Sequence, residues 1–188
     1  IRPGTDGLLV LSLVHTLLKR KKIDLEYLQS FTNAPFLVNI SSTDENKRLF
    51  LKDKDGVPLV LDHFSGELKR FSDKGVKPSL TKAHSNQYGS FKTVFSLLTE
   101  KYLDDAYSPK LIAPQCGLKE EQILTLAEEI SSTAFDKAIY IDQDWVDFRG
   151  EKRSGFVGRP VSFHAMRGIS AHSNGFQTCR AIHLLQII

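Results

Sequence analysis

The run from Arg167 to Gly175 is the part of this sequence best suited to binding a ligand. It places two glycines, two serines, an asparagine, a histidine and an arginine within nine positions. Residues 160–165 before it have the pattern of a buried strand, and an amphipathic helix is expected from Phe176. A strand, a polar glycine-bearing turn and a helix together bring backbone N–H groups to a phosphate or another polar cofactor group. An ordinary turn capped by Ser173 or Asn174 is the alternative.

The remaining polar side chains predict no metal or disulfide site. Cys116 and Cys179 are far apart in the sequence and have no Cys-x-x-Cys spacing, so neither zinc nor a disulfide framework is indicated. The histidines are expected in packing or surface positions, and paired acids after a strand are expected to be solvated; these residues are His15, His63, His84, His164, His183, Asp142 and Asp144.

Composition excludes several classes of protein. The 188 residues are 41% hydrophobic and 25% charged, with a formal net charge of +3, which is ordinary for a globular domain. So small a charge does not support a nucleic-acid surface. The best apolar run, residues 8–18, is interrupted by Ser12, His15 and Thr16 and is shorter than the roughly 18 residues expected of a membrane span.

Periodicity predicts alternating helices and strands around a small β insertion. Helices are expected at 5–19, 25–30, 91–102, 119–132 and from 176, and strands at 138–141 and 161–165. Residues 48–51 and 58–61 flank Lys54-Asp55-Gly56 and predict a hairpin, with a third strand at 66–71. Residues 72–89 are expected to form an exposed loop, and 143–158 a charged connection. This pattern predicts an α/β fold with a parallel sheet.

The ends of the sequence predict a piece of a longer polypeptide. The chain begins at Ile1 without a methionine, and it stops at Ile187-Ile188 inside a helical pattern without a terminating glycine.

Four segments together resemble the catalytic subunits of the dimethyl sulfoxide reductase family of molybdopterin oxidoreductases. They are residues 1–7, residues 32–38, residues 107–109 with 117–129 beyond them, and residues 158–186. They span nearly the whole chain in the family's order, and the first and last are fairly specific. Within the family, the second and fourth segments look most like the large subunits of sulfite-dehydrogenase and thiosulfate/polysulfide-reductase enzymes.

The resemblance implies a cofactor, partners and a fold. Such enzymes bind molybdopterin guanine dinucleotide with molybdenum, and commonly an iron–sulfur cluster in an upstream region. Their partners are an iron–sulfur electron-transfer subunit, with a membrane-anchor subunit in some cases. The implied architecture is a Rossmann-like parallel-sheet dinucleotide-binding lobe. It divides into a helical start at 1–47, a β insertion and loop at 48–90, and the rest of the lobe at 91–188.

The resemblance also implies binding residues. Gly4, Thr5 and Asp6 match a cofactor-contacting turn, in which the Asp6 carboxylate suits the N1–H and amino hydrogens of guanine. A helix N-cap at Thr5 or Asp6 is the alternative. The remaining implied contacts are Arg167, Gly168, Ala171 and His172. Arg167 could pair with a phosphate or face an anionic substrate, with a surface or interdomain salt bridge as the alternative. His172 could donate to a pterin ring, with a buried, hydrogen-bonded histidine as the alternative.

The resemblance implies that this chain is a fragment of a molybdenum oxidoreductase. Alone, the fragment is expected to be inactive, and it could form oligomers. The metal's side-chain ligand and the cluster cysteines would lie upstream, so no catalytic residue is assigned. The implied reaction of the intact enzyme is a two-electron redox reaction on a sulfur oxyanion or a similar small substrate. The alternatives are a non-catalytic structural or electron-transfer subunit of related fold and a freestanding nucleotide-binding module. The sequence does not assign the protein to a cellular compartment.

Overall fold

The computed structural model describes residues 1–41, 47–87 and 89–188, which form two compact units. The helical unit comprises Ile1–Asp24, Lys101–Gln143 and Gly155–Ile188, and the β-rich unit comprises Leu25–Glu100 and Asp144–Ser154. This division differs from the expected boundaries at 47/48 and 90/91. Residues 42–46 of the expected first segment and Tyr88 of the expected insertion and loop lie outside the described residues.

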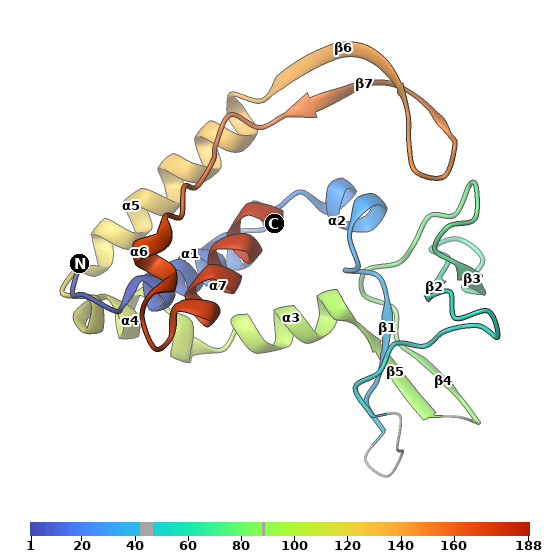
Figure 1. Ribbon diagram of the computed structural model, residues 1–188, viewed down its shortest axis with the longest axis horizontal. Coiled ribbons are helices and arrows are strands. Elements are labelled where there is room, and N and C mark those ends of the chain that lie inside the picture. Colours follow the sequence, from blue (N-terminus) through green and yellow to red (C-terminus); the bar gives the residue numbers. More distant parts are fainter. Residues whose placement is uncertain (42–46, 88) are drawn as a thin grey trace. The chain divides into compact units, whose positions relative to one another are not determined.

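The helical unit is built around one apolar helix (Figure 1). In chain order its elements are α1 (Asp6–Lys19), η1 (Asp105–Tyr107), α4 (Pro109–Cys116), α5 (Glu120–Ser131), the π-helical turn η2 (Ser132–Asp136), α6 (Arg167–Ser170) and α7 (Gly175–Ile187). The middle of α1 is buried, including Leu13, Val14 and Leu17, and this helix packs against α4, α5 and α7. The expected helices at 5–19, 119–132 and from 176 are confirmed.

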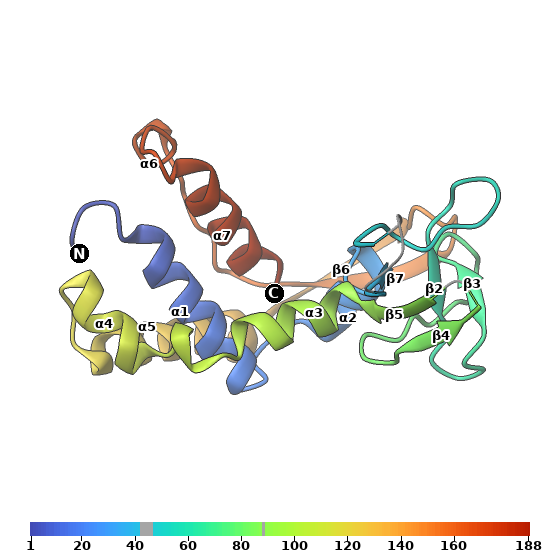
Figure 2. The same cartoon turned by 90° about the horizontal axis from the view of Figure 1, so that it is seen from below.

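Helices α1 and α7 run parallel, as Figure 2 shows. Near their N-terminal ends, Asn174 Nδ2 donates to the Gly4 carbonyl at 3.1 Å. A Cβ on Gly7 would lie 3.0 Å from Thr178 Oγ1, so glycine permits the close approach of the two helices. Past their C-terminal ends, the Asp24 backbone N–H donates to the Ile188 carbonyl at 2.6 Å. The two N-termini therefore lie side by side.

The β-rich unit contains small antiparallel sheets. Its elements are α2 (Leu25–Phe31), β1 (Leu37–Asn39), β2 (Leu59–Leu61), β3 (Leu68–Arg70), β4 (His84–Asn86), β5 (Gly89–Thr93) and most of α3 (Val94–Tyr102). One sheet has the order β1-β5-β4, and β2 pairs with β3. Leu37, Leu61 and Phe91 form its buried core.

A two-stranded ribbon, β6 (Ile139–Val146) with β7 (Lys152–Gly158), contributes residues to both units. Its tip belongs to the β-rich unit. There Asp147 Oδ1 accepts from the backbone N–H groups of Arg149 and Glu151 at 2.9 and 3.0 Å. Asp147 Oδ2 accepts from Arg153 Nε and Nη2, both at 3.0 Å. These bonds hold the turn of the ribbon.

The structure differs from the expected parallel sheet. In the described part of the chain, β1/β5, β4/β5 and β2/β3 pair in antiparallel register. The short turn at Asp147–Glu151 makes β6 and β7 a hairpin, because parallel neighbours need a crossover of about a dozen residues. The 143–158 segment, expected as a charged connection, is therefore mostly strand.

The expected strand at 161–165 is absent, and the expected exposed loop at 72–89 is confirmed in most of its described residues but contains β4. Residues 159–166 are extended without strand pairing and largely exposed. Pro160 has no N–H to donate to a ladder. Within 72–89, β4 pairs with β5, while Val76 and Ser79 are buried. The predicted hairpin turn is present, with Gly56 at a φ of +80° and its N–H donating to the Asp53 carbonyl.

Candidate ligand site at two converging turns

The N-terminal turn is anchored by its own backbone. The Arg2 N–H donates to the Cys116 carbonyl at 2.9 Å, and Thr5 Oγ1 donates to the Arg2 carbonyl at 2.7 Å. Gly4 has a φ of +79°, and a Cβ at this position would have nothing within 4 Å. Its conformation, rather than crowding, therefore favours glycine.

The C-terminal turn is held close to the helix that follows it. The Gly175 N–H donates to the His172 carbonyl at 2.8 Å. A Cβ on Gly175 would lie 2.2 Å from the Ser170 carbonyl oxygen, so this position requires glycine. Asn174 precedes α7 but makes no side-chain cap, and its amide instead reaches Gly4.

In the first turn, neither Thr5 nor Asp6 caps helix α1 through its side chain. Thr5 occupies the N-cap position of α1 without a side-chain cap bond, and its hydroxyl donates to the Arg2 carbonyl. Asp6 is the first residue of α1, and its carboxylate has no hydrogen bond or ion pair within the described residues. The structure therefore places an available carboxylate beside two helix N-termini.

The N-termini of α1 and α7 make the electrostatic potential of the site more positive. Each helix carries a partial positive charge at its N-terminal end, together with backbone N–H groups that lack intrahelical partners. Helices α1 and α7 contain 14 and 13 residues, which is enough for a developed dipole. Their convergence suits an anion such as a phosphate group.

A hollow of about 440 Å³ lies in the helical unit between the extended segment before α6 and one side of α7. Its lining includes Arg167, Ser170 and Met166, with Cys179 and His183 from α7. Gln186 Nε2 donates to the Phe163 carbonyl at 3.2 Å and ties the segment to the helix. In the described residues, the Arg167 guanidinium has no ion-pair partner, so a bound anion could take that place.

The seven residues predicted as cofactor contacts fall into two groups. Gly4, Thr5 and Asp6 are half-buried at the start of α1, whereas Arg167, Gly168, Ala171 and His172 are exposed around α6. The Asn174–Gly4 bond joins the turns that carry them, but of the seven only Arg167 lines the hollow. Gly168 has nothing within 4 Å of a potential Cβ, so packing within the described residues does not require glycine there.

Sequence reasoning missed several residues of this region. His164 and His183 were expected to pack in a strand and on an apolar helix face, but both are exposed and line the hollow. The error at His164 follows from the absent strand. Gly7 and Asn174 join the two turns through contacts that are distant in sequence. Gly7, a glycine inside an expected helix, was the one sign in the sequence that another segment packs closely there.

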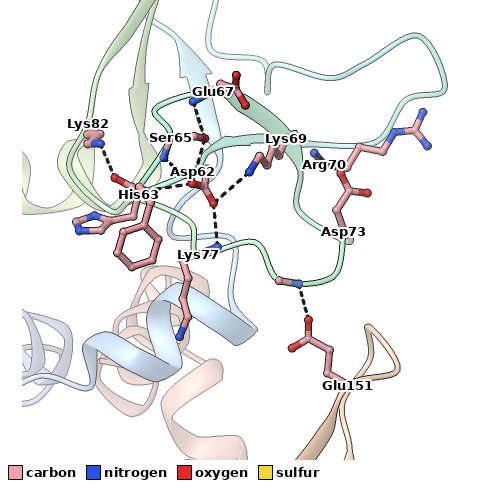
Figure 3. A network of polar contacts seen from close by, with 12 residues as sticks. Asp62, His63, Ser65, Glu67, Lys69, Arg70, Asp73, Lys77, Lys82 and Glu151 are labelled. Carbon is pink, nitrogen blue, oxygen red and sulfur yellow. Dashed lines mark hydrogen bonds and ion pairs between the residues drawn. The ribbon is translucent and has the colours of Figure 1, made fainter.

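A second polar cluster lies in the β-rich unit around Asp62 (Figure 3). Asp62 Oδ1 accepts from the Phe64 and Ser65 backbone N–H groups at 3.1 and 2.9 Å, and Oδ2 accepts from the Lys77 N–H at 3.2 Å. The Ser65 N–H, most of all, lowers the pKa of the Asp62 carboxyl, against the opposing effect of burial. Because the loop itself uses both oxygens, this cluster holds the loop in place and leaves little capacity for a ligand.

The described residues contain no cluster of three or more histidine, cysteine or acidic side chains able to hold a metal ion. Among them, no helix combines the length and apolarity needed to traverse a bilayer.

Comparison with known proteins gives an informative similarity. No protein-family model matches the chain. The chain is 33% identical over 200 aligned positions to a sulfite dehydrogenase subunit of Allochromatium vinosum. The alignment covers 100% of this chain and 20% of that protein, so the chain spans about a fifth of its relative's length.

These findings correct the resemblance drawn from the motifs. The chain is not recognised as a member of the dimethyl sulfoxide reductase family, because no family model matches it and its relative is covered over only 20% of its length. The short motifs at the two turns are too few to place it in that family. The supported statement is narrower: this chain is similar to one part of a sulfite dehydrogenase subunit.

Proposed function

We propose that this chain is part of a larger oxidoreductase subunit that acts on a sulfur oxyanion, and that it binds the nucleotide portion of a molybdopterin guanine dinucleotide. The similarity to a sulfite dehydrogenase subunit supports the oxidoreductase-related role. The convergence of the α1 and α7 N-termini, joined by the Asn174–Gly4 bond, is the observation that carries the cofactor proposal.

The side chains present fit such a group in part. The Asp6 carboxylate can accept two parallel hydrogen bonds from the N1–H and the amino group of guanine, a pairing that adenine does not offer. The backbone N–H groups at the two helix N-termini can receive the diphosphate. Arg167 can add a bidentate contact to a phosphate oxygen.

The chain's share of the work is binding, orientation and electrostatics. When bound in an intact enzyme, the molybdenum group would supply the two-electron redox chemistry. The open space at Gly4 and Gly168 leaves room for close approach of a planar or charged group to the backbone. Iron–sulfur and membrane-anchor subunits belong to the same proposal as partners of the intact protein.

A nucleotide titration tests the proposal. The ¹⁵N-labelled chain is titrated with guanosine diphosphate and adenosine diphosphate, with amide shifts followed by NMR. We expect the guanine nucleotide to shift the amides of Gly4, Asp6 and Gly168 and to bind more tightly than the adenine nucleotide. Asp6→Asn should weaken guanine binding about tenfold, since a charge-assisted hydrogen bond is lost.

Two further variants sharpen the test. Gly168→Ala meets no neighbouring heavy atom within 4 Å, so it should fold normally and lose affinity only where a ligand approaches the backbone. Asp142→Asn, an exposed acid elsewhere in the helical unit, is the matched control and should bind as the parent chain does. Equal binding of the two nucleotides, or no effect of Asp6→Asn, would contradict the proposal.

A further inference from the structure

A second cavity in the helical unit lies away from the converging turns and has no role in the proposed function. It measures about 510 Å³ and is bordered by α1, the segment around η1 and α4, and the start of α5. Its polar lining comprises His15, Thr16, Lys19, Arg20, Asp105, Ser108, Lys110 and Glu120. The size is that of a small-molecule site.

His15 is a buried residue in the lining of this cavity. It is 1% exposed, and its Nδ1 lies 2.9 Å from the Tyr102 carbonyl oxygen. A carbonyl oxygen only accepts hydrogen bonds, so Nδ1 carries the proton and Nε2 of the neutral ring is an acceptor. Nε2 has no partner within the described residues, although His15 lines the cavity. An acceptor that faces a cavity can take a hydrogen bond there from water or from a ligand's donor.

The charges at the cavity are of both signs. Arg20 is engaged by Glu128 at 2.7 Å. In the described part of the chain, Lys19 and Lys110 have no ion-pair partner, and neither do Asp105 and Glu120. Thr16 already donates its hydroxyl to the Ser12 carbonyl at 2.8 Å. The groups left over are therefore one acceptor on the buried His15 ring, two exposed cations and two exposed carboxylates.

We propose that this cavity binds a small zwitterion of the α-amino-acid class. Its ammonium group would donate to His15 Nε2 and lie near the carboxylates of Asp105 and Glu120. Its carboxylate would pair with Lys19 and Lys110. A simple anion would meet the two acids without compensation, and a simple cation would meet the two lysines. Leu111 and Leu124 provide apolar wall for a side chain.

The test is isothermal titration of the 188-residue chain with the common amino acids. For the tightest binder, the N-acetyl and C-amide analogues are then titrated. Each analogue removes one charge, so each should bind at least about tenfold more weakly. The proposal is overturned if none of the amino acids binds with a Kd below about 10 mM, or if both analogues bind as tightly as the parent.

Variants locate the site. Glu120→Gln and Lys110→Gln should each weaken binding about tenfold. Glu121→Gln and Lys137→Gln, which change exposed charges outside the cavity lining, should leave it unchanged. The same affinity in all four variants would overturn the assignment to this cavity.

The ring nitrogens of His15 give a readout that does not depend on a variant folding. In ¹⁵N spectra, the amino acid should shift the Nε2 resonance while Nδ1 keeps its bond to Tyr102. Binding that leaves both ring resonances unmoved would also overturn the proposal.

Discussion

Asp62 is a single side chain that joins two backbone segments of the β-rich unit. Its side chain is buried and accepts from the backbone of two different segments, at Ser65 and Lys77, while Lys69 lies 3.7 Å away. Strands β2 and β3 have only three residues each, so the loop between them needs support from such side-chain bonds.

Asp62→Asn should destabilise the β-rich unit and reduce its sensitivity to acid. Because the folded-state pKa of Asp62 is lowered, its stabilising effect is present above the unfolded value of about 4 and is lost as pH falls through the folded value. Urea unfolding at pH 7 and pH 3 should therefore show a larger difference for the parent chain than for the variant. An equal pH dependence in both would contradict this account.

Arg149 illustrates a second kind of support. Its guanidinium lies 4.6 Å from the Phe71 ring centroid and 4.8 Å from that of Phe148, and Nε donates to the Phe71 carbonyl at 2.8 Å. Burial lowers the pKa of Arg149, against the raising effect of Glu151 and Asp147. Within the β-rich unit, this residue attaches the tip of the ribbon to the segment after β3.

At the scale of elements, the turn before α7 depends on one glycine. Gly175→Ala would place a Cβ 2.2 Å from the Ser170 carbonyl oxygen, so the backbone must move. We expect a loss of about 1–3 kcal/mol in the free energy of unfolding, as for other overpacked sites. Urea denaturation measures it, and Gly168→Ala, which meets no such neighbour, is the control. Equal stability of the two variants would show that the turn tolerates the side chain.

Periodicity predicted most of the helices because apolar residues recur every three or four positions along their buried faces, as in α1 and α5. Lys54-Asp55-Gly56 predicted its turn for a similar local reason. Pairing is not local, and an apolar run such as 161–165 has no neighbouring strand within the described chain. The site was predictable as two polar turns. Their meeting through Asn174 and Gly4 is a contact across 170 positions that a single sequence does not reveal.

At the scale of the molecule, the two units should respond separately to core substitutions. Ile123 is fully buried in the helical unit and Leu37 in the β-rich unit. Ile123→Ala and Leu37→Ala should each cost about 2–5 kcal/mol. In hydrogen-exchange measurements, each variant should lose amide protection mainly in its own unit. Uniform loss across the chain in both variants would mean that the molecule unfolds as one cooperative block.

Neither unit is a continuous stretch of chain: the backbone leaves one and enters the other at 24/25, 100/101, 143/144 and 154/155. This interleaving affects when the helical unit can be completed during synthesis. Helix α1 packs against α4, α5 and α7, so the side of α1 that faces α7 stays uncovered until α7 has been synthesised. Nascent chains stalled before residue 175 should accordingly leave this side of α1 exposed and be favoured clients for chaperones.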